Sequence, residues 1–257
     1  MATVNVTNWA EFVDAVAVSG DTVVLPQGDR WDMNTIAPEG VTGNITVACE
    51  KIVGNGTMIM NGHFYGSFQV SGTEIDDLHI ISFLSEVLIQ NSNTPTYDRC
   101  MFSGLIANSG RLVATGNATW NRCAVNVESQ STNNAASGQD VFTGTVNYCR
   151  IIYHAANIGT IRFSGFSNSE FVFYCPQCTK IYVEQLVNCT IRGSLSACTY
   201  VGYYSYKYGS STNIVNMDDL AEGAQLKFTA LVGVTDTQMK DASYLASLGF
   251  PIGGDDE

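Results

Sequence analysis

The sequence has little charge. Only 14% of its 257 residues are Asp, Glu, Lys or Arg, whereas a soluble protein typically carries about 25%. Lys and Arg number 12 against 24 Asp and Glu, which gives a formal net charge of −12. A strongly acidic chain repels a phosphate polymer and an anionic lipid surface, so we expect neither a nucleic-acid partner nor a membrane partner.

Long apolar runs are also missing. No stretch reaches the roughly 20 apolar residues that a membrane-spanning helix needs. The start of the chain has neither basic residues nor an apolar core, so we expect no secretion signal. The polar surface must come from Ser, Thr, Asn and Gly, which are poor helix formers and favour β-structure. Aromatic residues make up 11% of the chain, which argues against disorder.

The chain contains eight cysteines. An even number in a short secreted chain predicts disulfides, but this chain is long and we expect no secretion signal. We therefore expect buried, reduced thiols that pack as small apolar groups. The eight are Cys49, Cys100, Cys123, Cys149, Cys175, Cys178, Cys189 and Cys198.

The C-x-x-C segment from Cys175 to Cys178 is a partial match to a four-thiolate metal site that would also use Cys189 and Cys198. The second pair is spread over nine positions, whereas structural zinc sites use two tight pairs. We expect no metal and no cofactor. The sequence leaves open whether Cys175 and Cys178 are free thiols.

One pattern recurs at intervals of 20 to 26 residues. In each copy a mostly small residue is followed two positions later by an apolar one. Alternate residues of a strand point to the same face, so these positions form two inward columns with mostly polar flanks. The first column is Leu78, Cys100, Cys123, Cys149, Ser169 and Cys189, and the second is Ile80, Phe102, Val125, Ile151, Phe171 and Ile191.

A second short strand is visible in each repeat. Short strands at a fixed period predict a solenoid of about nine coils, stacked at the interstrand spacing of about 4.8 Å. Leucine-rich repeats share this period but need a Leu/Asn consensus that is absent here. The second strands are expected at 22–25, 45–47, 68–70, 87–89, 112–114, 141–143, 161–163 and 181–183.

Capping helices are expected at both ends, because a solenoid otherwise exposes its core there. Asn8 can cap the first helix with Glu11 reaching back, and Trp9, Phe12, Val13 and Val16 form its apolar stripe. Residues 235–238 form a second capping pattern, and Gly249 ends that helix. We therefore expect an N-terminal cap over 1–24, a parallel β-helix over 25–234, and a C-terminal capping helix with an acidic tail over 235–257.

The segment 6–26 resembles the N-terminal cap of right-handed parallel β-helix proteins of the pectate-lyase-like superfamily, and rungs such as Asn188-Cys189-Thr190-Ile191 are similar to theirs. Residues 235–250 resemble the closing segment of some bacterial surface and bacteriophage β-helix proteins. The resemblance covers nearly the whole chain and implies an all-β fold, a right-handed parallel β-helix. It implies no single activity, because this fold hosts lyases, hydrolases, adhesins and phage structural proteins.

Lyases of this superfamily use acidic calcium ligands with an Arg or Lys base, and its hydrolases use paired carboxylates. Asp76 and Asp77 are the catalytic candidates on this ground. In the predicted register Asp77 lies one coil below Arg99, and Arg150 lies one coil below Glu170, so ion pairing between coils is the alternative interpretation. No column gathers three acids and a base, and His63, His79 and His154 match no metal motif.

A tyrosine strip over 200–208 is the most suggestive surface. Tyr204, Tyr206 and Tyr208 share a face if the segment is extended, and Tyr203 lies beside them. Exposed tyrosine offers a large contact area to a protein partner and can stack on sugars. The alternative is that the strip packs under the C-terminal cap.

These observations favour a non-enzymatic structural protein of a bacteriophage virion: a capsid decoration or head fibre protein, or a tail-spike-like module, with glycans as a further ligand. Such proteins assemble in the host cytoplasm, where reduced thiols are expected. Other capsid or tail components would be its partners, and the family analogy suggests a homo-oligomer such as a trimer. The alternatives are a polysaccharide lyase or glycoside hydrolase, and an adhesin on the bacterial cell surface.

Overall fold

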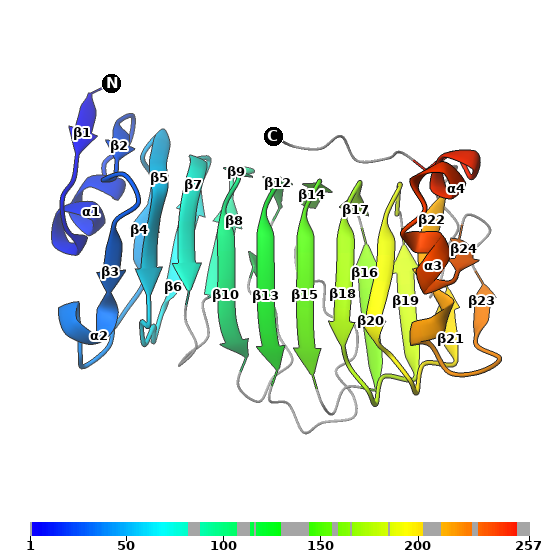
Figure 1. Cartoon of the computed structure of the whole chain (residues 1–257). Coiled ribbons are helices and arrows are strands. Elements are labelled where there is room, and N and C mark those ends of the chain that lie inside the picture. The colour runs from blue at the N-terminus through cyan, green and yellow to red at the C-terminus, as the bar shows by residue number, and fades with distance from the viewer. Residues whose placement is uncertain are drawn as a thin grey trace.

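The computed structural model describes residues 2–81, 88–106, 114–115, 117–129, 144–155, 159–164, 166–184, 186–202, 212–227 and 231–250. The chain is a parallel β-solenoid of about eight turns, with 51% of residues in strands and 13% in helices. The strands stand side by side along a rod, with the N-terminal helix at one end and the C-terminal helices at the other (Figure 1). The predicted all-β solenoid class is confirmed.

Each complete turn contributes three strands, and every pairing is parallel. Two of the three strands meet at a bend, and the strands on both sides of this bend belong to one continuous sheet. The strands before the bend are β2 (Thr22–Val24), the first parts of β5 (Lys51–Met60) and β7 (Glu74–Ile81), β9 (Thr96–Asp98), β12 (Ala118–Asn121), β14 (Gly144–Asn147) and β17 (Phe166–Ser167), and β1 (Thr3–Asn5) pairs with β2.

The strands after the bend carry the repeat that is visible in the sequence. Each inward residue stands in register with the inward residue of the next coil, as Phe102 does with Val125 and Val125 with Ile151. These strands are β3 (Arg30–Asp32), the second parts of β5 and β7, β10 (Met101–Ile106), β13 (Ala124–Ser129), β15 (Arg150–Ala155), β18 (Glu170–Tyr174), β20 (Thr190–Ser194), β22 (Asn213–Asn216) and β24 (Leu231–Val234).

A third wall is built from two four-stranded sheets. It contains most of the second strands expected from the sequence, while all of the expected strand 141–143 and all but Ala114 of the expected strand 112–114 lie outside the described residues. Thr22–Val24 was wrongly grouped with this wall, because it pairs with β1 and β5 instead. The strands are β4 (Ile45–Val47), β6 (Ser67–Ser71), β8 (Leu88–Ser92), β11 (Ala114–Thr115), β16 (Thr160–Ser164), β19 (Lys180–Glu184), β21 (Tyr200–Gly202) and β23 (Gln225–Lys227).

A left-handed residue makes the bend in successive coils. The sequence pattern placed most of these residues at outward positions of an uninterrupted strand; their side chains do face outward, but a φ near +50° bends or interrupts the strand there. A left-handed backbone costs most non-glycine residues roughly 1–2 kcal/mol, and Asn tolerates it best. The bend residues are Asp77, Arg99, Arg122, Tyr148, Asn168 and Asn188, with φ between 50° and 54°.

The residue after each bend turns its side chain inward. The thiol of Cys100 donates to the carbonyl oxygen of Asp98 at 3.3 Å, and the thiols of Cys123, Cys149 and Cys189 make the same bond two residues back. Ser169 replaces the thiol by a hydroxyl and donates to Ser167 at 2.8 Å. All five side chains are buried, so the predicted first inward column is confirmed.

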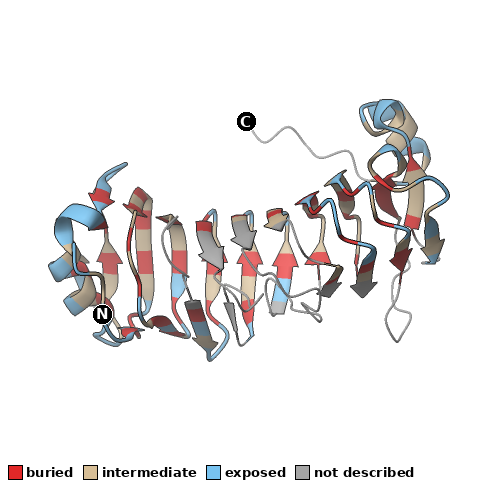
Figure 2. Cartoon of the chain, turned by 90° about the horizontal axis from the view of Figure 1, so that it is seen from below, coloured by how far each residue is buried: buried red, intermediate tan, exposed pale blue. Residues whose placement is uncertain are grey.

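The apolar core runs along the axis inside the three walls. Figure 2 shows buried residues recurring at the same level in successive strands. Large rings fill the middle of the rod: Tyr97 stacks on Trp120 with centroids 4.0 Å apart, and Phe166 packs edge-on against Phe171 at 4.8 Å. Burying such rings is a large favourable term in the coils that contain them.

Helix α1 (Trp9–Val16) closes the N-terminal end as the sequence predicts. Asn8 accepts from the Glu11 backbone N–H at 3.0 Å, while the Glu11 carboxylate reaches back to Thr7 instead of Asn8. Phe12 and Val16 are buried in the core. A further short helix, α2 (Met33–Ile36), follows β3.

The C-terminal end differs from the prediction. The expected single helix is two short ones, α3 (Asp236–Met239) and α4 (Ala242–Ser247), because Asp241 caps the second. The capping box of Thr235 with Gln238 forms as predicted, and Gly249 ends α4 with a φ of 72°. Neither helix has a buried residue, so these helices add little to the core.

The thiol column gives a stability prediction. Cys149→Ser keeps the donor to the Asn147 carbonyl, as Ser169 does one coil on, so we expect it to lower the free energy of unfolding by about 1 kcal/mol. Cys149→Leu overfills a fully packed corner and should lower it by about 2–3 kcal/mol. Urea unfolding followed by circular dichroism measures both, and equal stability of the two variants would contradict the role given to this corner.

The bend column gives a second prediction. Tyr148 is 66% exposed and has a φ of 54°, so Tyr148→Asn relieves backbone strain while losing little packing. We expect a gain of about 0.5–1 kcal/mol in the free energy of unfolding. Tyr148→Ala is the matched control, because Ala has no preference for this conformation and should bring no gain. Thermal unfolding of the three proteins decides the matter.

Candidate functional site

Asp76 and Asp77, the catalytic candidates, have different partners. Asp76 is the last residue of β7 before the bend, and its Oδ1 accepts from Nη2 of Arg99 at 2.5 Å. Asp77 lies in the bend itself, with its Oδ1 3.4 Å from Nε2 of His79. The predicted pairing of Asp77 with Arg99 is therefore wrong. Arg99 pairs with Asp76 instead, because Asp77 lies in the bend and its carboxylate faces His79.

An ion-pair ladder runs along the axis from Asp76. Asp98 is the register partner of Asp76 on the next coil. Arg99 lies between the two carboxylates, with its Nη1 3.2 Å from Asp98, and Arg122 adds a bond from Nε to Asp98 at 2.8 Å. Asp76 and Asp98 are each 21% exposed. The two arginines thus join the two aspartates of adjacent coils.

A second ladder joins three later coils. Nε of Arg150 lies 2.9 Å from Oε2 of Glu170, as the sequence register predicts. Nε of Arg192 lies 2.6 Å from Oε1 of the same carboxylate, which was not predicted. Arg192 was missed because it lies two residues beyond the column of Arg150 and Glu170 and crosses diagonally to reach it.

The ladders decide what these carboxylates can do. A general acid needs a proton and a nucleophilic carboxylate needs a free lone pair near substrate. Here the carboxylates form ion pairs with guanidinium groups of neighbouring coils, which stabilises the coil register modestly. These carboxylates are Asp76, Asp98 and Glu170. Among the described residues, no group of three or more His, Cys, Asp or Glu side chains is placed to hold a metal ion.

The cysteines of the described structure are all buried and free, including Cys175 and Cys178. Cys178 and Cys198 form a second thiol column at another corner, where each donates to the carbonyl two residues ahead at 3.3–3.4 Å. Cys189 belongs to the first column instead. The C-x-x-C segment and the two later cysteines therefore do not converge on one site.

Burial changes the acidity of these thiols. Desolvation raises the pKa of Cys49 to about 11 and that of Cys189 to about 12. A thiol with a raised pKa is a poor nucleophile and a poor metal ligand, because only the thiolate reacts. Cys49 and Cys189 thus have a packing role.

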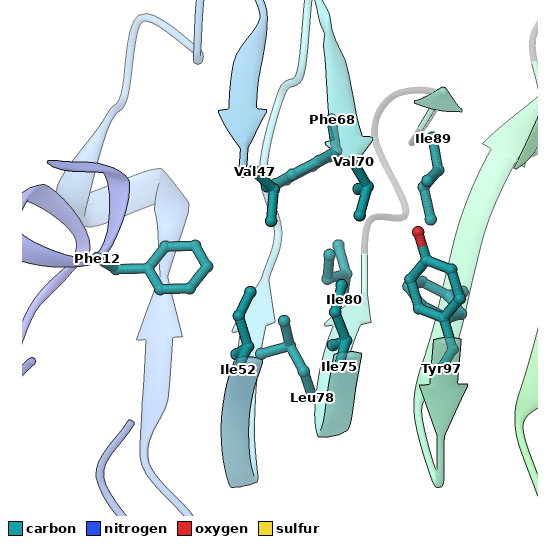
Figure 3. Close-up of a pocket in the computed structure, with 11 residues that line it drawn as sticks. Phe12, Val47, Ile52, Phe68, Val70, Ile75, Leu78, Ile80, Ile89 and Tyr97 are labelled. Carbon is teal, nitrogen blue, oxygen red and sulfur yellow. The ribbon is translucent and has the colours of Figure 1, made fainter. Parts of the chain in front are cut away.

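A small apolar cavity lies in the N-terminal half of the rod (Figure 3). Its volume is about 20 Å³, enough for one water molecule. Phe12 enters it from α1, and Val47, Ile75 and Ile80 line it from the three walls. Such walls offer a water almost no hydrogen bonds, so the cavity is a packing void and not a substrate pocket.

The tyrosines Tyr203, Tyr204, Tyr206 and Tyr208 lie outside the described residues, so their partner or glycan role stays a prediction. An exposed aromatic pair that the sequence reading missed lies elsewhere. The imidazole of His154 stacks on the ring of Tyr174, with centroids 4.5 Å apart and planes at 12°. A signal existed, since His154 lies five residues after Cys149 and Tyr174 lies five residues after Ser169, the same position in successive repeats.

Comparisons of the chain with family models, with curated proteins and with solved structures found no match. The fold and the candidate site are therefore described from the geometry of this chain. Among the described residues, none of the helices has the length and apolar character to cross a bilayer.

The buried thiols predict a pH dependence. The ordinary thiol pKa is 9.0, and Cys189 in the native protein keeps its proton up to about pH 12. Between these values the unfolded chain binds fewer protons than the native one, so the free energy of unfolding falls as pH rises, by up to about 1.4 kcal/mol per pH unit.

Urea unfolding at pH 8 and pH 10 measures this fall. Cys189→Ser is the control, because it lacks the titrating group and should lose about 1 kcal/mol less between the two pH values. An identical pH dependence of the two proteins would show that Cys189 is not protected in the native state.

Proposed function

We propose that this protein is a non-enzymatic structural component of a bacteriophage virion: a capsid decoration or head fibre protein, or a tail-spike-like module. The observation that carries the proposal is the use of charged groups within the coil itself. Asp76, Asp98 and Glu170 hold arginines of adjacent coils, as expected of a rod selected for rigidity and not for turnover.

The interior supports the same proposal. A parallel solenoid fits a structural or tail-spike-like protein, because every coil buries apolar area against two neighbours. Thiols fill the corners as free groups, which suits assembly in a reducing host cytoplasm. Other capsid or tail components would be the partners, and a homo-oligomer such as a trimer would be the assembled form.

Two other functions are outcomes of the tests below. A polysaccharide lyase or glycoside hydrolase would need Asp76 or Asp77 to act on a substrate, and Asp76 is committed to Arg99. A bacterial surface adhesin would use the same rigid rod at the cell surface. Neither has a specific contact in its favour.

Mass spectrometry of purified particles tests the proposal. Particles made by the genome that encodes this chain should contain the protein at a fixed ratio to the major capsid protein, after a density gradient that removes host membranes. Its absence from the particles, or its recovery with the host surface fraction, would reject the virion role and favour the adhesin.

A depolymerisation assay tests the enzymatic alternative. We expect the purified protein to release no reducing ends and no unsaturated products from acidic or neutral polysaccharides. If cleavage appears, Asp76→Asn and Asp77→Asn locate it: loss of activity in either variant, with unchanged thermal unfolding, would overturn the non-enzymatic assignment.

A further inference from the structure

Methionine side chains gather on the outer face of β5 and β10. Methionine is one of the residue types that proteins bury most often, yet three of the seven in this chain lie on this face. Met58 and Met60 flank the buried Ile59 on β5. Met101 precedes the buried Phe102 on β10 and is 38% exposed. Alternate residues of a strand face opposite ways, so all three thioethers point outward.

An imidazole stands between two of these thioethers. Strand β7 lies between β5 and β10 (Figure 1), and His79 on β7 is in register with Met58 on one side and with Met101 on the other. The three backbones are therefore stacked in steps of about 4.8 Å. The next residue, Ile80, is buried, so the ring of His79 faces outward, where 23% of its side chain is exposed. We call Met58, His79 and Met101 the Met–His–Met row.

A carboxylate lies beside one nitrogen of this ring. Oδ1 of Asp77 is 3.4 Å from Nε2 of His79. This contact favours the tautomer with the proton on Nε2, which leaves the lone pair on Nδ1. A carboxylate that takes the far N–H of an imidazole is the arrangement that orients histidine ligands in metal sites. The ring is thus prepared to offer Nδ1 to a metal ion.

The donor set selects the kind of metal. Thioether sulfur is a soft, neutral ligand that suits Cu(I), and imidazole suits copper as well, whereas Mg²⁺ and Ca²⁺ take oxygen ligands. Methionine is unbranched and has three rotatable bonds, so sulfur atoms from the two flanking coils can lean over the ring between them. The row is open on one side, because the small Ala124 follows Met101 in register.

The charge beside the row favours a monovalent ion. Arg30 stands next to Met58 in register at the other end of the row. Its positive charge repels a divalent ion about twice as strongly as a monovalent one at the same distance. The single carboxylate of Asp77 matches one positive charge.

We propose that the Met–His–Met row binds one Cu(I) ion. The sulfur atoms of Met58 and Met101 and Nδ1 of His79 are the ligands, and Asp77 orients the ring. Such a site uses methionine sulfur, so it is compatible with the absence, among the described residues, of a cluster of His, Cys, Asp and Glu that could hold a metal. The bound ion would join three adjacent coils. This inference goes beyond the structural role proposed above and does not depend on it.

Silver(I) nitrate is the probe, because Ag(I) shares the preference for sulfur and imidazole and keeps one oxidation state. The full chain carries ¹³C-labelled methionine methyl groups, which NMR reads in a chloride-free buffer. One equivalent should shift the methyl signals of Met58 and Met101 and leave those of Met33 and Met239 in place. Methyl signals are more specific than a count of bound silver, because the free thiols also bind silver if the protein opens. Unmoved signals of Met58 and Met101 would overturn the proposal.

Variants of the row test its ligands. Met58→Leu, Met101→Leu and His79→Gln each remove one ligand, and each should weaken silver binding by about tenfold or more in isothermal titration against free methionine as a competitor. Leucine keeps nearly the volume of methionine. Met239→Leu is the matched control, because Met239 lies on α3 at the far end of the rod (Figure 1) and its loss should leave the affinity unchanged.

The triple variant of the row decides between this site and the thiols. Met58→Leu with Met101→Leu and His79→Gln should abolish binding in the affinity range of the wild-type chain. If the triple variant binds silver as tightly as the wild-type chain and unfolds at the same temperature, the metal sits elsewhere and the proposal is wrong.

Zinc(II) tests the selectivity of the row. Zn(II) prefers imidazole, thiolate and carboxylate ligands, so it should leave the methyl signals of Met58 and Met101 in place. If Zn(II) shifted both signals and bound as tightly as silver, the row would not select soft monovalent ions and the assignment to Cu(I) would be wrong.

The nitrogen spectrum of His79 tests the positioning role of Asp77. With silver bound, the ¹⁵N signal of Nδ1 should shift while Nε2 keeps its proton. Asp77→Asn keeps the bend, because Asn tolerates the left-handed conformation that Asp77 has, but it removes the charge and should weaken silver binding about tenfold. Silver on Nε2, or an unchanged affinity of the variant, would overturn the role given to Asp77.

Discussion

The structure depends on one corner repeated along the axis. A left-handed residue bends the chain, and the next side chain turns inward and donates to the carbonyl two residues back, as Cys100 does to Asp98. That donor gives the partly buried carbonyl a partner and helps to hold the strand after the bend in place. Because each corner lies above the last, the strained bends and the small inward groups stack as columns.

Sequence periodicity predicts the inward-facing side chains that recur from coil to coil. The spacing of Cys100, Cys123 and Cys149 marks successive coils, because in each of them a small donor occupies the corner after the bend. The strand before each bend escaped prediction, since it is short and the left-handed residue interrupts its alternation. Asp77 was misplaced for the same reason, and its neighbour Asp76 took the expected partner.

Outward features were harder to predict, because they depend on side chains of different coils meeting across the ladder. The pairing of Arg150 with Glu170 follows directly from register, whereas Arg192 reaches the same carboxylate diagonally. His154 and Tyr174 are far apart in the chain and adjacent in space. The fold explains the low charge in part, because inward columns and corners occupy many positions, and seven of the 36 charged residues lie in the two ladders.

The unequal ends give the rod a direction. In a solenoid the stability is close to a sum over neighbouring coils, so opening starts where a terminal coil has the least support. Helix α1 buries Phe12 and Val16 in the core, whereas α3 and α4 bury no residue. The N-terminal coils are therefore the anchored end, and loss of structure under heat or mechanical load proceeds coil by coil from the C-terminal end toward it.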